Sequence, residues 1–567
     1  MRKPAAIVIL GPGSLATARR IQQCYPDALI HGLVGRVEGD RQYLEFGTTL
    51  RELYQQDTPI IALCAAGIVI RTLAPLLLEK GVEPPVLAVA EDGSAVVPLL
   101  GGLGGVNVMA REIATALQVA PAITTSGELR FGTCLLNPPS GYSLGDLEQG
   151  KRFVSDLLAG EPVRVEGAAP WLDQAQLPQD AQARLAIRID SAAGVPAPDE
   201  LRIYPRNVVV AVSAGTPDVS TAVSDALHRA GLAGQSLACL LAADSDMARV
   251  ELHHAALALG VPLRFARASD DIEQWLGDAL GLPVSLQPMG GVVIAVAERP
   301  VDPLQLGRAR GRLAVIGLGP GAAELMVPAV RAELDRANDV LGYETYVRMA
   351  GPLRADQVQH CTDNREEMQR ARHAFELAAQ GRSVVVVSSG DPGVFAMAAA
   401  VLEALHESTD ADWHNVDLQI LPGVSASLAT AAQAGAPLGH DFCVMSLSDN
   451  LKPWSIIEKR LDLAAEADLA LAFYNPISRS RPWQLGRALE IVAQHRTANT
   501  PVVLGRDIGR PGQTLRVTTL GQLSPDQVDM RTMVLVGSST TCVFPRVEGG
   551  DWVYTPRWYG DKPRGMS

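Results

Sequence analysis

Short runs of β-branched and aliphatic residues alternate with segments of helical periodicity along most of the chain. Runs of this kind, bounded by glycine, proline or aspartate, predict buried strands, whereas the segments between them predict amphipathic helices. In a chain of 567 residues, this alternation predicts a multidomain α/β fold. The predicted strands are Ala6–Leu10, Ile60–Cys64, Val86–Ala90, Val208–Val212, Val292–Ala297, Leu313–Ile316, Val384–Ser388, Leu469–Phe473, Pro501–Leu504 and Met533–Val536.

Two stretches without this pattern indicate where domains end. Residues 159–206 are rich in Pro, Ala, Gln and Asp, and residues 298–312 contain a second break, ERPVDPLQLGRARGR. We therefore expect an α/β domain over 1–150, a middle or linker region over 151–206, a second α/β domain over 207–300, a linker over 301–312, and a last region that starts at 313.

The composition narrows the class of protein. A hydrophobic content of 47%, a charged content of 20% and a net charge of -13 argue against a nucleic-acid or anionic-membrane binder. The seven cysteines are scattered without a CxxC pair, which argues against a zinc site or a disulfide framework. No apolar run reaches the roughly 18 residues of a membrane span, and the N-terminal apolar segment is too short for a signal peptide. We expect a cytoplasmic protein with small-molecule partners and no metal site.

A glycine-rich turn follows the predicted strand in the stretch LAVIGLGPGA. Gly317 and Gly319 fit a loose dinucleotide-binding pattern, and Asp339 lies about twenty residues further on, where such sites hold a ribose. However, Pro320 and Pro328 delay the following helix, and no lysine is adjacent. The turn therefore favours a flat, uncharged ligand over a phosphate, and a tight turn without any ligand is the alternative.

Similar turns end other predicted strands. They occur in SSGDPGVFAMA (388–398), LPGVSASLATAA (421–432) and ALAFYNPISRSR (470–481), and TLRVTTL (514–520) contains a pair of threonines. Because open α/β sheets bind ligands at the carboxyl ends of their strands, these turns are candidates for one shared site.

The motifs GLGPG, SSGDPG, LPGVSA and FYNP, in this order, resemble the class III S-adenosylmethionine-dependent methyltransferases of cobalamin biosynthesis. The longer stretches LGYETYV and GHDFCVMSLSDNLKPWSIIEKRL are similar to the precorrin-3B C(17)-methyltransferase group, the CobJ/CbiH type, and the resemblance runs from about 313 to 545. It implies a two-domain class III methyltransferase fold over 313–555, with halves 313–422 and 423–555 and a cleft between them. It also implies methylation of precorrin-3B at C-17 with ring contraction to precorrin-4, and a homodimer formed through this region.

Transfer of a methyl group from a sulfonium requires alignment of donor and acceptor more than a base, because the leaving thioether is neutral. The resemblance implies that turns surround the S-adenosylmethionine donor with backbone groups and apolar faces. Asp391 could bind the donor or cap its own turn. The implied donor site comprises Gly319, Pro320, Gly321, Gly390, Asp391, Pro392, Val394, Phe395, Ser425, Ala426, Tyr474, Gly505, Thr518 and Thr519.

Ring contraction moves a hydroxyl proton, so an acid or base near the macrocycle is expected. The candidates are His440 and Asp441 in GHDFC, followed by Asp449, although His440 could be an ordinary loop residue. A precorrin carries many carboxylates, which cationic side chains would bind. The candidates for this role, some of which could be surface charges, are Lys452, Arg479, Arg481, Arg506 and Arg510.

The front of the chain resembles the cobalamin biosynthesis protein CbiG family, through ALCAAGIVIRTLAPLL, AVAEDGSAVVPLL and GGVN for its N-terminal part and residues 207–298 for its C-terminal domain. That family opens a lactone on a ring-contracted cobalt corrinoid and releases acetaldehyde. The family's loop histidine is absent from Gly101–Asn107, which predicts that this activity is lost. Glu91, Asp92 and Glu128 could still serve, although a solvated turn is the simpler interpretation.

Three alternatives remain open at this point. The first is cobalt-factor III as the methyl acceptor, together with an active cobalt-precorrin-5A hydrolase in the front half. The second is a dinucleotide-dependent oxidoreductase that uses Gly317, Gly319 and Asp339. In the third, residues 1–300 bind or channel a labile tetrapyrrole without reacting with it.

Overall fold

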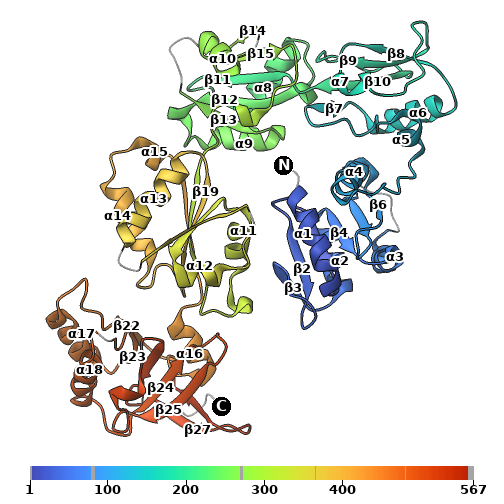
Figure 1. The fold of residues 1–567 in the computed structure, drawn as a ribbon. Coiled ribbons are helices and arrows are strands. Elements are labelled where there is room, and N and C mark those ends of the chain that lie inside the picture. The colour runs from blue at the N-terminus through green and yellow to red at the C-terminus, as the bar shows by residue number, and fades with distance from the viewer. Residues whose placement is uncertain are drawn as a thin grey trace, which may run out of the picture.

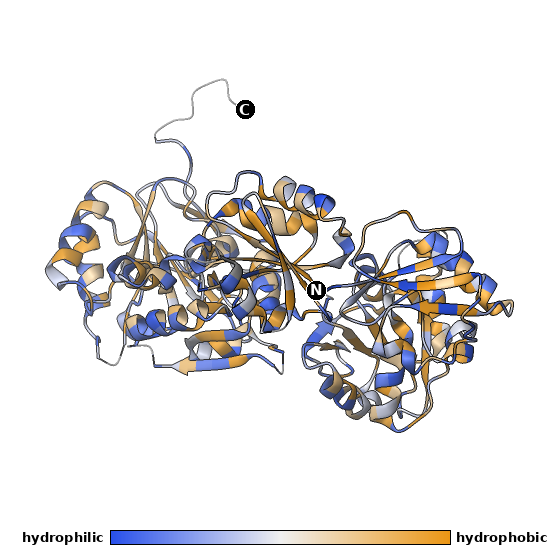
Figure 2. Cartoon of the chain, turned by 90° about the horizontal axis from the view of Figure 1, so that it is seen from above, coloured by the Kyte–Doolittle hydropathy of each residue, from blue (hydrophilic) through white to orange (hydrophobic). Residues whose placement is uncertain are grey.

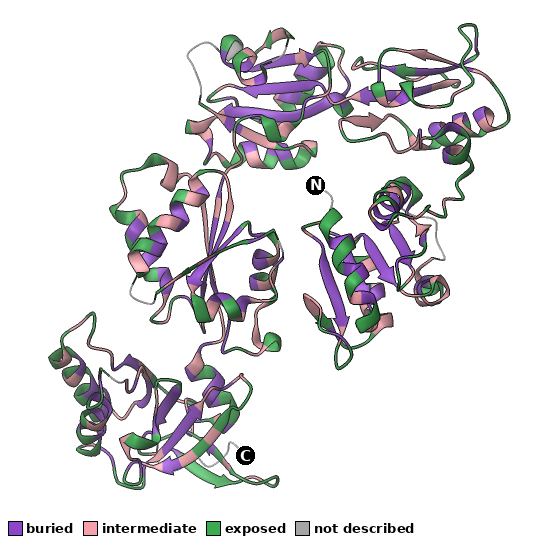
Figure 3. Ribbon diagram, viewed as in Figure 1, coloured by how far each residue is buried: buried purple, intermediate pink, exposed green. Residues whose placement is uncertain are grey.

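The structure, a computed structural model, describes residues 3–77, 83–267, 272–281, 283–354, 356–363, 366–478 and 480–559. Five sheet-centred units follow one another along an arc, and the first unit lies back against the fourth (Figure 1). The central strands of the larger sheets form the buried centres of the units (Figure 3). The predicted multidomain α/β class is confirmed.

The first unit is a doubly wound sheet in the order β3-β2-β1-β4-β5-β6. Its strands run parallel except β6, which is antiparallel to β5. Helices α1 and α4 pack on one face and α2 and α3 on the other. The elements are β1 (Ala6–Ile9), α1 (Leu15–Cys24), β2 (Leu29–Leu33), β3 (Arg41–Tyr43), α2 (Phe46–Gln55), β4 (Ile60–Leu63), α3 (Ala66–Leu73), β5 (Val86–Val89), β6 (Val96–Leu100) and α4 (Val106–Leu117).

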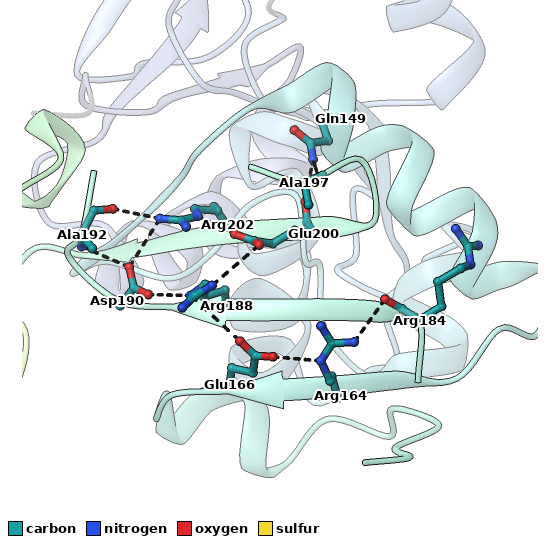
Figure 4. Close-up of polar contacts among 10 residues, drawn as sticks. All are labelled: Gln149, Arg164, Glu166, Arg184, Arg188, Asp190, Ala192, Ala197, Glu200 and Arg202. Atoms are coloured by element: carbon teal, nitrogen blue, oxygen red, sulfur yellow. Dashed lines mark hydrogen bonds and ion pairs between the residues drawn. The ribbon is translucent and has the colours of Figure 1, made fainter. Parts of the chain in front are cut away.

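The second unit is a four-stranded sheet in the order β7-β10-β9-β8, with helices on one face only. Its other face carries a network of charged side chains, in which Arg188 lies between Glu166 and Asp190 (Figure 4). This sheet fills the region 151–206, where a middle or linker region was expected, and begins before residue 150. The elements are α5 (Ser126–Phe131), β7 (Tyr142–Leu144), α6 (Leu147–Leu158), β8 (Val163–Glu166), α7 (Pro170–Asp173), β9 (Leu185–Ile189) and β10 (Glu200–Pro205).

The third unit is a five-stranded sheet in the order β13-β12-β11-β15-β14, with α8 and α9 on one face and α10 on the other. The expected linker after it is ordered, since Arg308 exchanges two backbone hydrogen bonds with Phe265 and pairs with Asp412 of the next unit at 2.7 Å. The elements are β11 (Val208–Val212), α8 (Val219–Arg229), β12 (Leu237–Ala243), α9 (Val250–Leu259), β13 (Leu263–Ala266), α10 (Ile272–Leu280), β14 (Val284–Met289) and β15 (Val292–Ala297).

The fourth unit is an all-parallel sheet in the order β18-β17-β19-β16-β20. Helices cover both faces of its central strands, which explains why these strands read as continuous apolar runs. The elements are β16 (Arg312–Gly317), α11 (Pro328–Arg336), β17 (Asp339–Tyr343), α12 (Glu344–Ala350), β18 (Val358–Thr362), α13 (Glu367–Ala379), β19 (Ser383–Ser388), α14 (Met397–Glu407), α15 (Ala411–His414) and β20 (Asp417–Leu421).

The fifth unit is a mixed sheet in the order β22-β23-β26-β24-β25, with a small sheet, β21-β28-β27, beside it. Helix α16 packs on one face of the mixed sheet, and α17 and α18 pack on the other. The elements are α16 (Ala426–Ala434), β21 (Gly435–Ala436), β22 (Phe442–Ser446), α17 (Trp454–Glu466), β23 (Ala470–Tyr474), α18 (Gln484–Ala493), β24 (Pro501–Arg506), β25 (Thr514–Thr519), β26 (Thr532–Val536), β27 (Cys542–Pro545) and β28 (Asp551–Tyr554).

Figure 2 shows that apolar residues follow the strands and the inward faces of the helices, while polar residues cover the outward faces. Within the described ranges, no helix combines the length and the apolar character that a membrane crossing requires.

Candidate active site

Two glycine turns are joined at the carboxyl ends of β16 and β19. The backbone N–H of Gly319 donates to the carbonyl of Gly390 at 3.1 Å, and the N–H of Gly390 donates back to Gly319 at 2.8 Å. This reciprocal pair holds the GLGPG turn and the SGDP turn side by side. The structure therefore brings together two of the motifs that the sequence places about seventy residues apart.

A third turn, after β20, packs against the first two with no room for side chains. A Cβ atom on Gly317 would lie 2.4 Å from the carbonyl oxygen of Gly390, and one on Gly423 would lie 2.2 Å from the same oxygen. Both distances are shorter than any tolerable contact, so these positions require glycine. The three turns consequently present closely packed backbone to whatever lies beside them.

Asp391 ties two of these turns together. Its Oδ1 accepts the N–H of Gly393 at 2.8 Å, and its Oδ2 accepts the N–H of Gly423 at 3.1 Å. Both carboxylate oxygens are therefore engaged by backbone. These bonds favour the turn-capping role for Asp391 over direct contact with a donor.

Phe395 combines exposure with an unusual backbone conformation. Its φ of 52° lies in the left-handed region, which costs energy for a residue other than glycine, and its side chain is 51% exposed. The ring lies 5.4 Å from the ring of Tyr474, measured between centroids. Strain at an exposed aromatic residue is typical of a functional position.

Tyr474 links the fifth unit to the turn after β20. Its hydroxyl accepts the N–H of Ser427 at 3.1 Å and lies 3.1 Å from the Ser427 hydroxyl. That hydroxyl lies 3.1 Å from the hydroxyl of Ser425, which caps α16. The turns and Tyr474 thus form one connected group across the two halves of residues 313–555.

Gly505 lies at the same end of the mixed sheet as Tyr474, and the side chain of Thr430 packs directly against its Cα. Thr518 and Thr519 do not lie there. Thr518 pairs with Val502 and Thr519 with Pro501, three and four ladder positions from Gly505, or roughly 10 Å or more along the strand. Thr518 also faces α17 and α18, on the opposite side of the sheet from Tyr474.

Two of the three proposed acid–base residues also lie far from Tyr474. His440 and Asp441 precede β22, whose first residue pairs with Ala470, whereas its last residue pairs with Tyr474. They therefore lie at the far end of the sheet, where the His440 ring packs 5.3 Å from that of Tyr559. Asp449 follows β22 at the Tyr474 end and accepts a hydrogen bond from Gln484 at 3.2 Å.

One predicted substrate-binding cation lies beside the exposed aromatic group. The ammonium of Lys452 is 5.8 Å from the centroid of the Phe395 ring. Burial, and secondarily the charge of Arg460, lowers the pKa of Lys452. A partly desolvated ammonium at this place suits pairing with a carboxylate.

Three of the other predicted cations, Arg481, Arg506 and Arg510, are engaged within the protein. Arg481 is 7% exposed and donates to the carbonyl of Asn475, and Arg506 pairs with Asp529 at 2.9 Å. Arg510 donates to the carbonyl of Pro320 and to the hydroxyl of Ser389, both in the fourth unit. Arg479 lies outside the described residues.

Asp339, the ribose-binding candidate of the oxidoreductase alternative, begins β17 and so lies at the opposite end of the parallel sheet from the glycine turns. Its carboxylate accepts hydrogen bonds from Arg382 at 2.5 Å and from His360 at 2.8 Å. This geometry does not support a dinucleotide site that uses Asp339.

Several residues that contact the candidate site residues and hold them in position were not identified from the sequence. Ser427 bonds Tyr474, Thr430 packs on Gly505, and the amide of Asn475 donates to the Ser446 hydroxyl at 3.1 Å. Asn475 has a φ of 51°, a conformation that asparagine adopts more readily than most residues. An asparagine directly after a predicted strand could therefore have indicated a turn with this backbone conformation. The other contacts depend on tertiary packing, which the sequence does not show.

The first unit contains a separate cavity of about 340 Å³ at the switch point between β1 and β4. Glu91 lines it, along with Ser14 and Cys64, and burial raises the pKa of the Cys64 thiol to about 11. Asp92 instead accepts the N–H of Ser94 in an exposed turn. Glu128 is buried and bound by Asn107 and Arg111, so its carboxylate is engaged within the protein.

Comparison with known proteins agrees with this geometry. Residues 312–524 match the model of the tetrapyrrole (corrin/porphyrin) methylases, and residues 48–128 match that of the cobalamin synthesis G N-terminal family. A precorrin-3B C(17)-methyltransferase from a Sinorhizobium species is 50% identical over 249 residues, which are 44% of this chain and 97% of that protein. The chain belongs to the tetrapyrrole methylases.

This tetrapyrrole methylase has further relatives of the same kind. A probable cobalt-factor III C(17)-methyltransferase of Salmonella typhimurium is 40% identical over 247 residues, which are 44% of this chain and 99% of that protein. The crystal structure of the methyltransferase CobJ has 51% identity and a TM-score of 0.41, and the match covers 43% of this chain and all of that one. The chain thus joins a CbiG-like front region to a methylase.

Proposed function

We propose that this protein methylates precorrin-3B at C-17, with contraction of the ring to precorrin-4, as a step of cobalamin biosynthesis. The observation that carries the proposal is the convergence of the turns at Gly319, Gly390 and Gly423 with Phe395 and Tyr474. The name of the Sinorhizobium relative, which is 50% identical, supports the choice of acceptor.

S-adenosylmethionine, the methyl donor of this family, supplies an activated methyl group when bound. The residues present fit such a ligand, because packed glycine backbone permits close approach and the exposed ring of Phe395 and the half-buried ring of Tyr474 offer apolar contact. Gly319, Pro320, Gly390, Ser425, Ala426 and Tyr474 would hold it. Their task is to fix the orientation of the donor, because alignment is the main requirement of this transfer.

Two side chains at the same end of the fifth unit would act on the acceptor. Lys452, next to Phe395, would pair with a carboxylate of the tetrapyrrole. Asp449 is the remaining candidate for moving the hydroxyl proton during ring contraction, since His440 and Asp441 lie at the far end of the sheet.

The test is incubation of the purified protein with S-adenosylmethionine and either precorrin-3B or cobalt-factor III, with product masses measured over time. Methylated, ring-contracted product from precorrin-3B is the expected result. Methylation of cobalt-factor III alone would overturn the choice of acceptor, and saturable NADH binding without donor binding would overturn the methyltransferase itself.

A second candidate function for the front region is favoured by the cavity at the switch point of the first unit. Glu91 lines this cavity, and a carboxylate there could activate water for opening a lactone on a cobalt corrinoid. The loop Gly101–Asn107 lacks the family's histidine, so we favour binding of a tetrapyrrole without hydrolysis. Release of acetaldehyde from a lactone-bearing cobalt corrinoid would decide for hydrolysis.

We also propose that the methylase forms a homodimer in the cytoplasm. The β27–β28 hairpin exposes Phe544, Trp552 and Tyr554 at 48%, 40% and 39%, an apolar surface that a second copy could cover. The exposed free thiols of Cys24 and Cys361 fit a reducing compartment. Light scattering on the intact chain and on a Phe544→Glu variant tests the dimer, and cell fractionation tests the location.

A further inference from the structure

The hairpin between β24 and β25 extends from the fifth unit onto the glycine turns of the fourth. Gly509, with a φ of 81°, packs on Pro320, so closely that a Cβ atom would lie 2.9 Å from the proline Cγ. The base of the hairpin is fixed by Asp507, whose carboxylate pairs with Arg506 at 3.2 Å and Arg531 at 3.3 Å. This hairpin is therefore a constrained structure in contact with the proposed donor site.

Arg510, near the tip of the hairpin, contacts both the GLGPG turn and the SGDP turn of the proposed S-adenosylmethionine site. Its Nε donates to the carbonyl oxygen of Pro320 at 2.9 Å, and its Nη2 donates to the hydroxyl of Ser389 at 3.2 Å. These partners lie 190 and 121 residues earlier in the chain. Gly321 makes room for the side chain, because a Cβ atom there would lie 2.7 Å from the Arg510 Cγ.

The geometry of a guanidinium suits this bridge. Its N–H groups are held in a rigid planar fork, so one side chain can fix two acceptors in a defined relative position. A lysine ammonium carries its three N–H donors on one nitrogen at the end of a flexible stem. It would not hold the Pro320 carbonyl and the Ser389 hydroxyl in the same relative position.

We propose that Arg510 is a positioning residue for methyl transfer, which fixes the GLGPG and SGDP turns of one half against the acceptor-side residues of the other. This inference rests on the proposed function. Arg510 does not itself contact the reacting atoms in the proposal. Because its bonds span both halves, its loss would disturb donor binding and also the alignment of the bound donor with the acceptor.

The variants Arg510→Gln and Arg510→Lys test this role, with Arg516→Gln as the matched control. Arg516 lies on β25 of the same hairpin, and its exposed side chain has no hydrogen bond or ion pair with the residues that the structure describes. Ser389→Ala removes one of the two bonds without removing the arginine, and so covers the case in which Arg510→Gln fails to fold.

Three quantities are measured on the full chain: the Kd for S-adenosylmethionine by calorimetry, the single-turnover methylation rate at saturating donor, and the midpoint of thermal unfolding. For Arg510→Gln we expect a Kd about tenfold higher and a rate about a hundredfold lower. Arg510→Lys should recover most of the affinity but little of the rate. Ser389→Ala should fall between wild type and Arg510→Gln in both.

Unchanged Kd and rate in Arg510→Gln would overturn the inference. So would a loss of rate that only follows a lower unfolding midpoint, since that would be a structural effect alone. Failure of this inference can be distinguished from failure of the proposed function. If the proposed function were wrong, the wild type and Arg516→Gln would themselves form no methylated product.

Discussion

The backbone N–H of Gly423 donates to Oδ2 of Asp391 at 3.1 Å, and this bond joins the turns that end β20 and β19, the two strands that flank β16. The other oxygen of Asp391 accepts the N–H of Gly393. One carboxylate thus satisfies two backbone donors at once.

Asp391→Asn tests that arrangement. The amide would keep one acceptor oxygen but turn its NH2 group toward a second N–H, which leaves a donor unsatisfied. We expect the free energy of unfolding to fall by about 1–3 kcal/mol and the Kd for S-adenosylmethionine to rise. Chemical denaturation and calorimetry measure the two effects.

The control for this variant is Asp410→Asn. Asp410 also accepts a backbone N–H, that of Asp412, but at an exposed helix N-cap where asparagine serves equally well. Asp410→Asn should leave stability and donor affinity unchanged. Equal effects of the two substitutions would contradict the role assigned to Asp391.

Gly423→Ala addresses the packing of the turns. The added methyl group would meet the carbonyl oxygen of Gly390 at 2.2 Å, so the backbone must move and the turns must separate. We expect donor affinity to be lost, with destabilisation of about 2 kcal/mol or more. Gly277→Ala is the control, since nothing lies within 4 Å of a Cβ there and α10 should gain up to about 1 kcal/mol.

Phe395→Ala should change the Kd for S-adenosylmethionine more than it changes the free energy of unfolding. The ring is half exposed, so its removal should change the free energy of unfolding by less than about 1 kcal/mol. If the ring faces the donor, the Kd for S-adenosylmethionine should rise several-fold. Leu451→Ala, at a residue 93% exposed, should change neither quantity. A Kd for Phe395→Ala equal to that of wild type would remove Phe395 from the donor site.

The carboxyl group of Asp339 should make the free energy of unfolding depend on pH. Burial alone would raise the pKa of its carboxyl, but hydrogen bonds from Arg382 and His360 outweigh burial, and the pKa is lowered. A lowered pKa in the folded state means that the carboxylate stabilises the fold above its unfolded pKa of about 3.9 and loses this effect as the pH falls through the folded value.

Asp339→Asn should therefore be destabilised relative to wild type at pH 7, and this difference should shrink as both proteins are acidified below about pH 4. Urea unfolding at several pH values measures it. A difference that stays constant over this range would show that the charge of Asp339 is not responsible.

The sequence predicted the α/β class and the turns, because an apolar run followed by glycine and proline is a local signal. It could not place His440 or Thr518. Which end of β22 or β25 lies beside Tyr474 depends on the direction of each strand in a mixed sheet, and only the pairing registers fix that. The contacts of Arg510 join residues more than a hundred positions apart, which no local pattern encodes.

The contact between Arg41 of β3 and Asp335 of α11 closes the first four units into a ring. Both side chains are about one-third exposed, at 33% and 35%, and such a pair contributes about 1 kcal/mol at most, less in high salt. Beneath it, burial and then the charge of Arg41 lower the pKa of His31 to about 4, so this imidazole adds no charge near neutrality. Raising the ionic strength should consequently let the first unit swing away from α11, and small-angle scattering would record a larger radius of gyration while every individual sheet stays intact.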